Sequence, residues 1–82
     1  MIFKMEVFVF TEIEQKVKID TEQIELDKLL KWAAVVESGG QAKHLIREGL
    51  ITVNEEIETK RSRKVKKGDV VECSEMFKLV VI

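Results

Sequence analysis

Several residue types on which common functions depend are scarce in this chain of 82 residues. It has no tyrosine, and aromatic residues make up only 6% of it, so a platform of stacked rings for single-stranded nucleic acid is not expected. One histidine and one cysteine are too few to form a zinc site. The single cysteine, Cys73, excludes an internal disulfide, and we expect its thiol to be buried and inert in a reducing cytoplasm.

Long hydrophobic runs are also missing. The continuous ones are far shorter than the roughly 20 residues that a membrane-spanning helix needs. No basic segment followed by a cleavable apolar core directs export, so we expect a cytoplasmic protein with no membrane partner. With 45% hydrophobic and 35% charged residues, the composition is that of one soluble domain with a modest core.

The net charge of −1 hides an uneven distribution of charge. Residues 1–27 contain three Lys or Arg against seven Asp or Glu, residues 28–67 contain ten against five, and residues 68–82 contain one against three. Phosphate binding depends on the local field, so the basic middle segment is the relevant feature. Six of the eight residues 60–67 are basic, a run that is either a solvated loop or a contact to nucleic acid.

Gly39 and Gly40 stand in tandem at the start of a predicted helix. Glycine costs roughly 0.5–1 kcal/mol relative to alanine inside a helix, so the pair indicates a gain elsewhere. Without side chains there, another backbone or a phosphate can approach the first N–H groups of the helix. Three basic residues follow on the same helix and favour phosphate: Lys43, His44 and Arg47.

The boundaries of this helix are well marked. Ser38 is a good N-cap, and Gln41 three residues later completes a capping box. Gly49 is a natural C-terminal cap, so we expect the helix to span residues 39–48. Its apolar stripe consists of Ala42, Leu45 and Ile46.

A second helix is predicted immediately upstream. Helical spacing of apolar residues extends it over residues 26–36, so that only Glu37 and Ser38 separate the two helices. Trp32 belongs to this helix, and we expect it to be half-buried where helix and sheet meet rather than to stack on a base.

The remaining segments alternate between apolar and polar residues. This pattern predicts strands at residues 16–19, 51–53, 57–59, 70–73 and 77–82, and a less regular one at 2–10. Residues 60–67 are predicted to form a loop, and Gly68-Asp69 a turn. Met5 is an alternative start of the chain.

Catalysis finds little support in the sequence. Ser38, His44 and Asp69 are chemically able to form a triad, but Ser38 is better explained as a cap and His44 as a helix-face residue. The glycine pair lacks the GKS or GKT ending and the preceding strand of an NTPase phosphate-binding loop. We therefore expect no enzymatic activity, no catalytic residues, no metal and no cofactor.

An ordered set of motifs resembles the S-four RNA-binding domain, named for ribosomal small-subunit protein four. The set comprises ELDKLL at residues 25–30, SGGQAK at 38–43, Leu45-Ile46, Glu48-Gly49, Val53-Asn54 and Gly68-Asp69-Val70. The chain is similar to the stand-alone bacterial members of the YaaA/YbcJ kind, which share the Ser-Gly-Gly opening and the basic run. The resemblance extends from about Val17 to Glu72. It implies an α+β fold, with two short helices, arranged like a helix-turn-helix, on a small curved antiparallel sheet. Residues 16–82 would form this one domain, and residues 1–15 an N-terminal strand extension.

The resemblance also implies binding to structured RNA through the second helix, its entry turn and a neighbouring hairpin loop. By position, the RNA-binding residues would be Ser38, Gly39, Gly40, Gln41, Lys43, His44, Arg47, Lys60, Arg61, Arg63 and Lys64. Two departures from the family pattern stand out. Gly39 occupies a position where many members have arginine, which removes one side-chain contact. Glu55 follows Asn54 where glycine is usual, so the hairpin needs a different turn or a strained one.

Together, these features predict a non-catalytic, monomeric protein that binds ribosomal RNA or another folded RNA. Contacts to phosphates and 2′-hydroxyls should dominate, because A-form RNA hides its base edges in a deep major groove. No small-molecule substrate is expected. The alternative is an adaptor whose basic patch binds an acidic protein partner, and RNA recovered by crosslinking in cells would distinguish the two.

Overall fold

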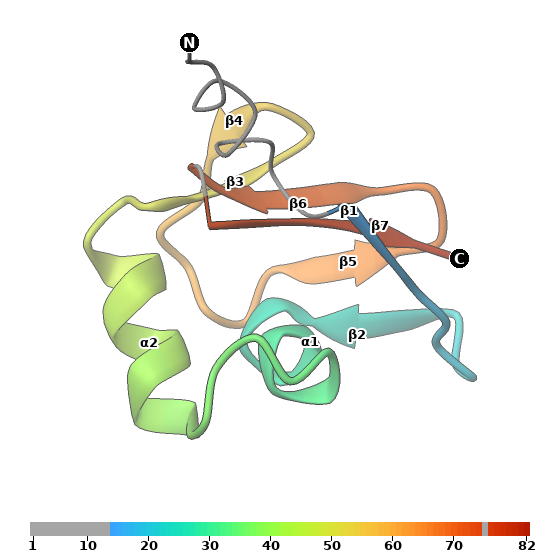
Figure 1. Ribbon diagram of the computed structural model, residues 1–82, viewed down its shortest axis with the longest axis horizontal. Coiled ribbons are helices and arrows are strands. Elements are labelled where there is room, and N and C mark those ends of the chain that lie inside the picture. Colours follow the sequence, from blue (N-terminus) through green and yellow to red (C-terminus); the bar gives the residue numbers. More distant parts are fainter. Residues whose placement is uncertain (1–13, 75) are drawn as a thin grey trace, which may run out of the picture.

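The computed structural model describes residues 14–74 and 76–82, which form two helices and two sheets (Figure 1). In chain order the elements are β1 (Glu14–Val17), β2 (Gln23–Glu25), α1 (Leu26–Trp32), α2 (Gly39–Arg47), β3 (Ile51–Val53), β4 (Glu56–Ile57), β5 (Lys64–Lys66), β6 (Val70–Cys73) and β7 (Phe77–Val81). The strand predicted at residues 2–10 and the alternative start at Met5 lie outside the described residues.

The strands form a large sheet and a small ribbon. The sheet has the order β1–β7–β6–β3–β4, in which β1 runs parallel to β7 and the other neighbours are antiparallel. β2 and β5 pair separately, with Glu25 opposite Lys64. Figure 1 shows both helices and the ribbon on one side of the sheet. The predicted α+β fold is confirmed, with a mixed sheet in place of a wholly antiparallel one.

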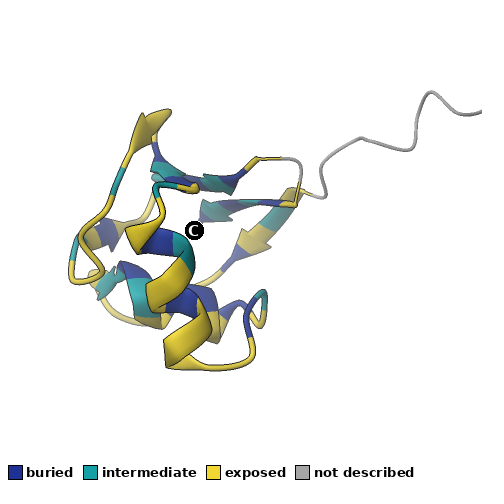
Figure 2. Ribbon diagram, turned by 90° about the vertical axis from the view of Figure 1, so that its left-hand side faces the viewer, coloured by how far each residue is buried: buried dark blue, intermediate teal, exposed yellow. Residues whose placement is uncertain are grey.

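Hydrophobic side chains from the helices and both sheets meet in one core. Fully buried members include Leu29 and Leu30 of α1, Ile46 of α2, Ile51 of β3 and Leu79 of β7. Burying a side chain of this size contributes about 1.5–3 kcal/mol. Figure 2 shows the buried residues on the sides of the helices that face the strands, with exposed residues outward. No polar or charged residue within the described ranges is buried.

α2 ends in a Schellman motif. Gly49 has a φ of 76°, and its N–H donates to the Ile46 carbonyl at 3.1 Å. The N–H of Leu50 donates to the Leu45 carbonyl at 3.2 Å, which completes the motif. The helix ends at Arg47 with Glu48 as its C-cap, so the prediction of a glycine stop is confirmed to within one residue.

α1 ends in the same motif, but with alanine in the left-handed position. Ala34 has a φ of 60° and donates its N–H to the Lys31 carbonyl at 3.0 Å. The N–H of Val35 donates to the Leu30 carbonyl at 3.2 Å. Glycine usually occupies this position, because a Cβ makes the left-handed conformation costly.

This termination makes α1 shorter than predicted. The helix ends at Trp32 rather than at residue 36, and residues 33–38 separate it from α2, not two residues. Ala33 and Val36 are nevertheless buried. Their spacing along the sequence is that of a helix, which is why a longer helix was predicted. The chain nevertheless leaves the helical conformation at Ala34.

The hairpin between β3 and β4 has a two-residue turn with both residues left-handed. Asn54 has a φ of 51° and Glu55 a φ of 73°, which is the type I′ geometry. Asn54 is held by its side chain, which donates to Asp69 Oδ1 at 3.1 Å and accepts the Val70 N–H at 2.9 Å. The turn is therefore of the usual kind but strained at Glu55. The second strand begins one residue earlier than predicted and ends at Ile57.

The prediction of a loop for all of residues 60–67 was wrong. Lys64–Lys66 form β5, which pairs with β2. The sequence did not predict β2, because a strand of three residues is too short to show a period. The first strand is also displaced, to Glu14–Val17 instead of residues 16–19, because its register with β7 starts at Glu14.

The single cysteine and the single tryptophan of the chain lie in contrasting environments. Cys73 is buried in β6 as predicted, with its Sγ 3.6 Å from Met76 Sδ. Trp32 is 59% exposed, so the prediction that it would be half-buried was wrong. Its indole Nε1 donates to the Lys18 carbonyl at 2.9 Å, which ties the ring to the segment after β1 without covering it.

Candidate nucleic-acid interface

The entry turn of α2 is fixed by two side-chain caps. Ser38 is extended, with a φ of −151°, and its Oγ accepts the Gln41 N–H at 3.1 Å. Gln41 Oε1 in turn accepts the N–H of Glu37 at 2.6 Å. The predicted capping box is thus formed with one change, because the return bond reaches the residue before the N-cap.

The two glycines leave the start of α2 open. A Cβ at Gly39 would lie 3.9 Å from Lys31 Cδ, and one at Gly40 would lie 3.8 Å from Ser38 Oγ. Both are ordinary contact distances, so tight packing does not require either glycine. Neither has a positive φ. Within the described residues, their N–H groups have no hydrogen-bond partner.

α2 separates an apolar face from a basic one. Ala42 and Ile46 are buried against the core, whereas the basic residues that follow the glycines are exposed. Lys43 and Arg47 are one turn apart and therefore lie side by side on the solvent face. The face is continuous with the open end of the helix, since Lys43 lies in the turn that follows the glycines.

A single carboxylate organises the loop of residues 58–63, which we call the basic loop. Glu58 Oε2 accepts the N–H of Lys60 at 3.1 Å, and Oε1 accepts from Arg63 Nη1 at 2.7 Å. The hydrogen bond from Arg63 holds the pKa of the Glu58 carboxyl below its ordinary value. The N–H of Arg63 also donates to the Lys60 carbonyl at 3.1 Å and closes a turn.

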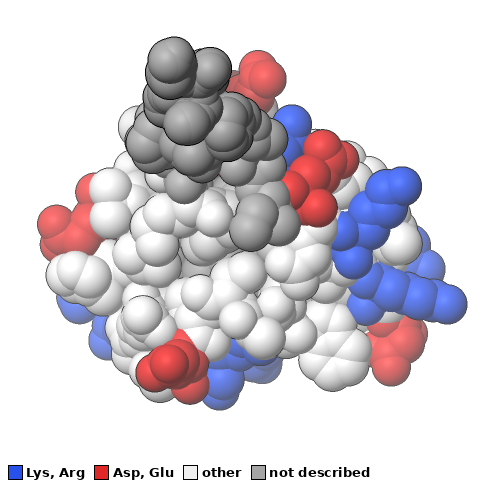
Figure 3. All heavy atoms as spheres, viewed as in Figure 1, with Lys and Arg blue, Asp and Glu red and all other residues white. Residues whose placement is uncertain are grey.

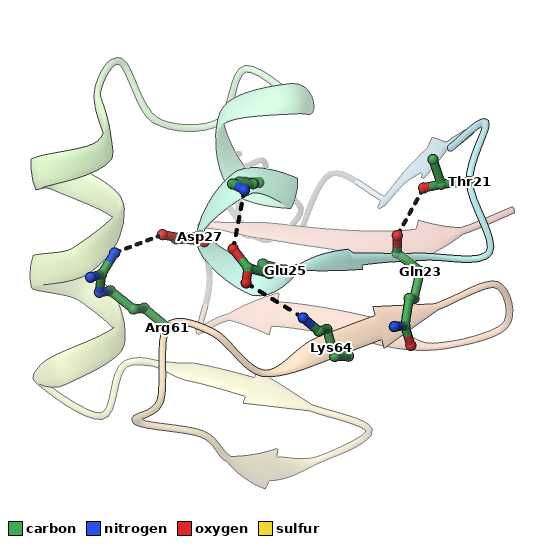
Figure 4. Close-up of polar contacts among 7 residues, drawn as sticks. Thr21, Gln23, Glu25, Asp27, Arg61 and Lys64 are labelled. Carbon is green, nitrogen blue, oxygen red and sulfur yellow. Dashed lines mark hydrogen bonds and ion pairs between the residues drawn. The ribbon is translucent and has the colours of Figure 1, made fainter.

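The backbone of the basic loop caps the first turn of α1. The N–H groups of Leu26 and Asp27 donate to the carbonyls of Arg63 and Arg61, at 2.8 and 3.1 Å. Asp27 Oδ2 accepts from Arg61 Nη1 at 3.3 Å, as Figure 4 shows. Asp27 Oδ1 is buried with no hydrogen-bond partner among the described residues, so Arg61 is the main compensation for this carboxylate. The loop is therefore built into the helix pair.

Ion pairs divide the predicted basic contacts into two groups. Glu25 accepts from Lys28 at 3.3 Å and from Lys64 at 3.5 Å, and the Lys28 hydrogen bond is the main cause that lowers its pKa (Figure 4). Arg61, Arg63 and Lys64 are thus paired with acids. In the part of the chain that the structure describes, no ion pair is formed by Lys43, Arg47 or Lys60.

The two predicted contact regions lie on neighbouring elements. Figures 1 and 4 view the molecule differently, and both show the basic loop running alongside α2 on its way to β5. Charge is unevenly spread elsewhere. On the face in Figure 3, Lys and Arg gather at the margin where β5 ends in Figure 1, and the centre has no charged side chains.

Comparison with known proteins identifies the family to which this fold belongs. A family model described as the S4 domain matches residues 17–82. The chain belongs to the S4 domain family. A relative named "Probable ribosome maturation protein RlbA", from Bacillus subtilis, is 48% identical over 56 residues, which make up 68% of this chain and 79% of that protein. The resemblance to the stand-alone S-four domains is thereby confirmed.

The RNA-binding residues of this S4 domain remain a prediction. Within the fold, some of them have structural roles of their own. The side-chain oxygens of Ser38 and Gln41 are engaged in capping. Sequence reasoning missed the acids that hold the basic residues, of which Glu25 and Glu58 make two contacts each. The position of Glu58 two residues before Lys60 is a local signal that could have been used.

The structure gives no support to the triad. Ser38 Oγ caps α2, and Asp69 accepts from the Asn54 amide and from the Lys66 N–H at 2.9 Å. Within residues 14–74 and 76–82, no three or more His, Cys, Asp or Glu side chains are grouped as metal ligands. No helix in those ranges is long and apolar enough to cross a membrane.

Proposed function

We propose that this protein is a non-catalytic RNA-binding protein that recognises structured RNA, either ribosomal RNA or another folded RNA, in the bacterial cytoplasm. Membership of the S4 family supports an RNA-binding or ribosome-related role. The name of the relative, a probable ribosome maturation protein, supports ribosomal RNA or a ribosomal precursor as the target. We expect the protein to act as a monomer.

The observation that carries the proposal is the open start of α2, the helix alongside which the basic loop runs. The amides of Gly39 and Gly40 have no partner among the described residues, and neither glycine carries a side chain of its own. A helix start attracts anions, because its N–H groups and its dipole both favour negative charge. One RNA phosphate would bind there, and Lys43 and Arg47 would neutralise the phosphates next to it.

The basic loop would contact the adjoining part of the RNA. Lys60 has no ion pair among the described residues and is free to bind a phosphate. Arg61, Arg63 and Lys64 form ion pairs with carboxylates of this chain. They would therefore attract phosphates less strongly, and their main contribution would be to fix the shape of the surface that meets the RNA. Phosphate contacts of this kind position a protein on RNA, and recognition then depends on the shape of the folded RNA.

The test is a pair of variants with equal change of charge. Lys43→Gln with Arg47→Gln removes two positive charges from the α2 face, and Lys16→Gln with Lys78→Gln removes two from the large sheet. We expect the first pair to weaken binding to ribosomal RNA fragments at least tenfold in fluorescence anisotropy, and the second to change it much less. Equal effects of the two pairs would contradict the proposed surface.

An adaptor that binds an acidic protein remains the second candidate, because the same unpaired lysines would fit it. Crosslinking in growing cells separates the two. Recovery of RNA joined to residues 38–47 or to the basic loop would support the proposal. Recovery of protein with no RNA would contradict it.

A further inference from the structure

Trp32 is exposed in a way that packing does not explain. It is the last residue of α1 and the only tryptophan of the chain, and 59% of it is accessible to solvent. Tryptophan usually gains its stability from burial of its large ring. Here the indole is instead held at the surface by its hydrogen bond to the Lys18 carbonyl. Tryptophan is enriched at interfaces, because its ring offers a large apolar face while its N–H is satisfied by a hydrogen bond.

The ring lines a hollow of about 460 Å³. This volume lies in the range of sites that take small planar molecules. Ile19 and Ile24 supply apolar lining next to the indole, and Thr21 and Gln23 supply polar groups. Figure 4 shows Thr21 and Gln23 linked by the hydrogen bond from Thr21 Oγ1 to the Gln23 carbonyl, at 2.8 Å. The hollow is therefore built from β2 and the turn before it, together with α1 and β5.

Charged side chains of both signs lie around the indole, and the carboxylates among them are those of Asp20 and Glu25. Lys28 and Lys64 line the same hollow, and Lys31 lines a second hollow beside Trp32. Lys31 also reaches the open end of α2, since its Cδ lies 3.9 Å from the position of a Cβ on Gly39. Trp32 thus shares one hollow with Lys64, which belongs to the predicted contact set, and another with Lys31, which lies near the glycine pair.

We infer that Trp32 stacks on an unpaired nucleobase of the RNA that the α2 surface holds. This inference rests on the proposed function and adds a base contact to it. A nucleobase offers a flat face to the indole, and a flanking phosphate meets the ammonium group of Lys31, which forms no ion pair among the described residues. The charged rim disfavours an apolar peptide, because binding one would desolvate the lysines and carboxylates around the ring without replacing their contacts with water.

Intrinsic fluorescence provides a direct test. With one tryptophan and no tyrosine, the emission of the chain reports Trp32 alone. The probes are an RNA hairpin with a single bulged adenosine, the same hairpin with an abasic site at the bulge, and the fully paired hairpin. Anisotropy of labelled RNA measures binding independently of the tryptophan. We expect the bulged adenosine hairpin to quench the emission and the other two to quench it much less.

Variants separate stacking from folding. Stacking is worth about 1–3 kcal/mol per base, which corresponds to about a 5- to 150-fold change in affinity. We expect Trp32→Ala to lose this factor for the bulged hairpin only, and Trp32→Phe to retain most of it. Met76→Ala is the matched control, because Met76 is also 59% exposed and lies in the turn between β6 and β7. Thermal melting checks that each variant is folded.

The outcomes are distinct. Quenching by the bulged adenosine together with a selective loss in Trp32→Ala supports the inference. Saturation with RNA at unchanged emission, or binding of the bulged hairpin by the folded Ala variant as tightly as by the unchanged protein, overturns stacking and leaves the proposed function standing. Failure of the unchanged protein to bind any hairpin at low salt overturns both.

Discussion

Glu58 accepts a hydrogen bond from Arg63 at 2.7 Å, in the middle of the most basic part of the chain. The same carboxylate accepts the N–H of Lys60 at 3.1 Å. An acid at this place lowers the positive charge that RNA would meet. It also holds both ends of a turn whose carbonyls cap α1. The negative charge of Glu58 should therefore weaken RNA binding, whereas its hold on the shape of the loop should strengthen it.

Replacing Glu58 by glutamine separates the two effects. If shape matters more, the variant should bind RNA more weakly than the parent despite its added positive charge. Charge-assisted hydrogen bonds contribute about 1.5–3 kcal/mol, so it should also lose about 1–2 kcal/mol of stability. Glu56→Gln is the control, because Glu56 is exposed, lies on β4 and forms no ion pair among the described residues. Fluorescence anisotropy at fixed salt measures the RNA affinity of the two variants, and urea unfolding measures their stability. Tighter RNA binding by both variants would contradict a positioning role for Glu58.

The lowered pKa of Glu58 predicts how stability varies with pH. Its folded pKa is below the ordinary value of 4.5, because the ionised form accepts from Arg63. The stabilisation is therefore fully present above the unfolded pKa and is lost as the pH falls through the folded pKa. We expect the difference in unfolding free energy between the parent and Glu58→Gln to be constant from pH 7 to about 5.5 and to shrink below about 4.5. Urea unfolding measures it, and a difference that persists undiminished at pH 3 would count against the ion pair.

The two helix ends make a second comparison possible. Ala34 and Gly49 occupy equivalent left-handed positions. Ala34→Gly should raise the unfolding free energy by about 1 kcal/mol, and Gly49→Ala should lower it by a similar amount. The Gly49 cost would be conformational, because a Cβ there would lie 3.7 Å from Ile57 Cγ2, an ordinary contact. Denaturant unfolding decides it, and a destabilised Ala34→Gly would show that the extra flexibility outweighs the relief of strain.

These examples also show where sequence reasoning succeeds and fails. The start and end of α2 could be predicted because Ser38, Gln41 and Gly49 act on neighbouring residues. The end of α1 could not, because alanine has a strong helix propensity and the left-handed φ of Ala34 follows from the surrounding packing. Similarly, β2 exists through its pairing with a strand about 40 residues later in the chain.

In the candidate site, too, local features could be predicted from the sequence and long-range contacts could not. Which residues are basic could be seen directly in the sequence, whereas their pairing could not. Arg61 meets Asp27, and Lys64 meets Glu25, only after the ribbon and α1 have formed. The placement of Trp32 likewise depends on a distant segment of the chain, because its indole donates to the Lys18 carbonyl.

Salt dependence should distinguish unpaired from paired cations. With about five phosphates neutralised, log K should fall against log salt with a slope near −3.5 to −4.5, at roughly −0.7 to −0.9 per phosphate. Lys60→Gln should reduce this slope by about one contact without loss of stability, because Lys60 has no ion pair among the described residues. Arg63→Gln should lower stability as well, since it breaks the bond to Glu58. A slope near zero for the parent would indicate that phosphates are not the main contact and would favour the adaptor.

Gly40→Val tests the use of the open helix start. A Cβ at this position would lie at ordinary contact distance from Ser38 Oγ, and valine costs less than glycine in a helix, so folding should be unaffected or slightly improved. The branched side chain would stand in front of the N–H groups that we assign to a phosphate. RNA binding should fall about tenfold with valine, which corresponds to roughly 1.4 kcal/mol, and less with alanine. Anisotropy and thermal melting measure the two quantities separately. Loss of binding in step with a lower melting temperature would instead assign the glycines to the fold, and would leave Lys43 and Arg47 as the contacts that α2 makes with RNA.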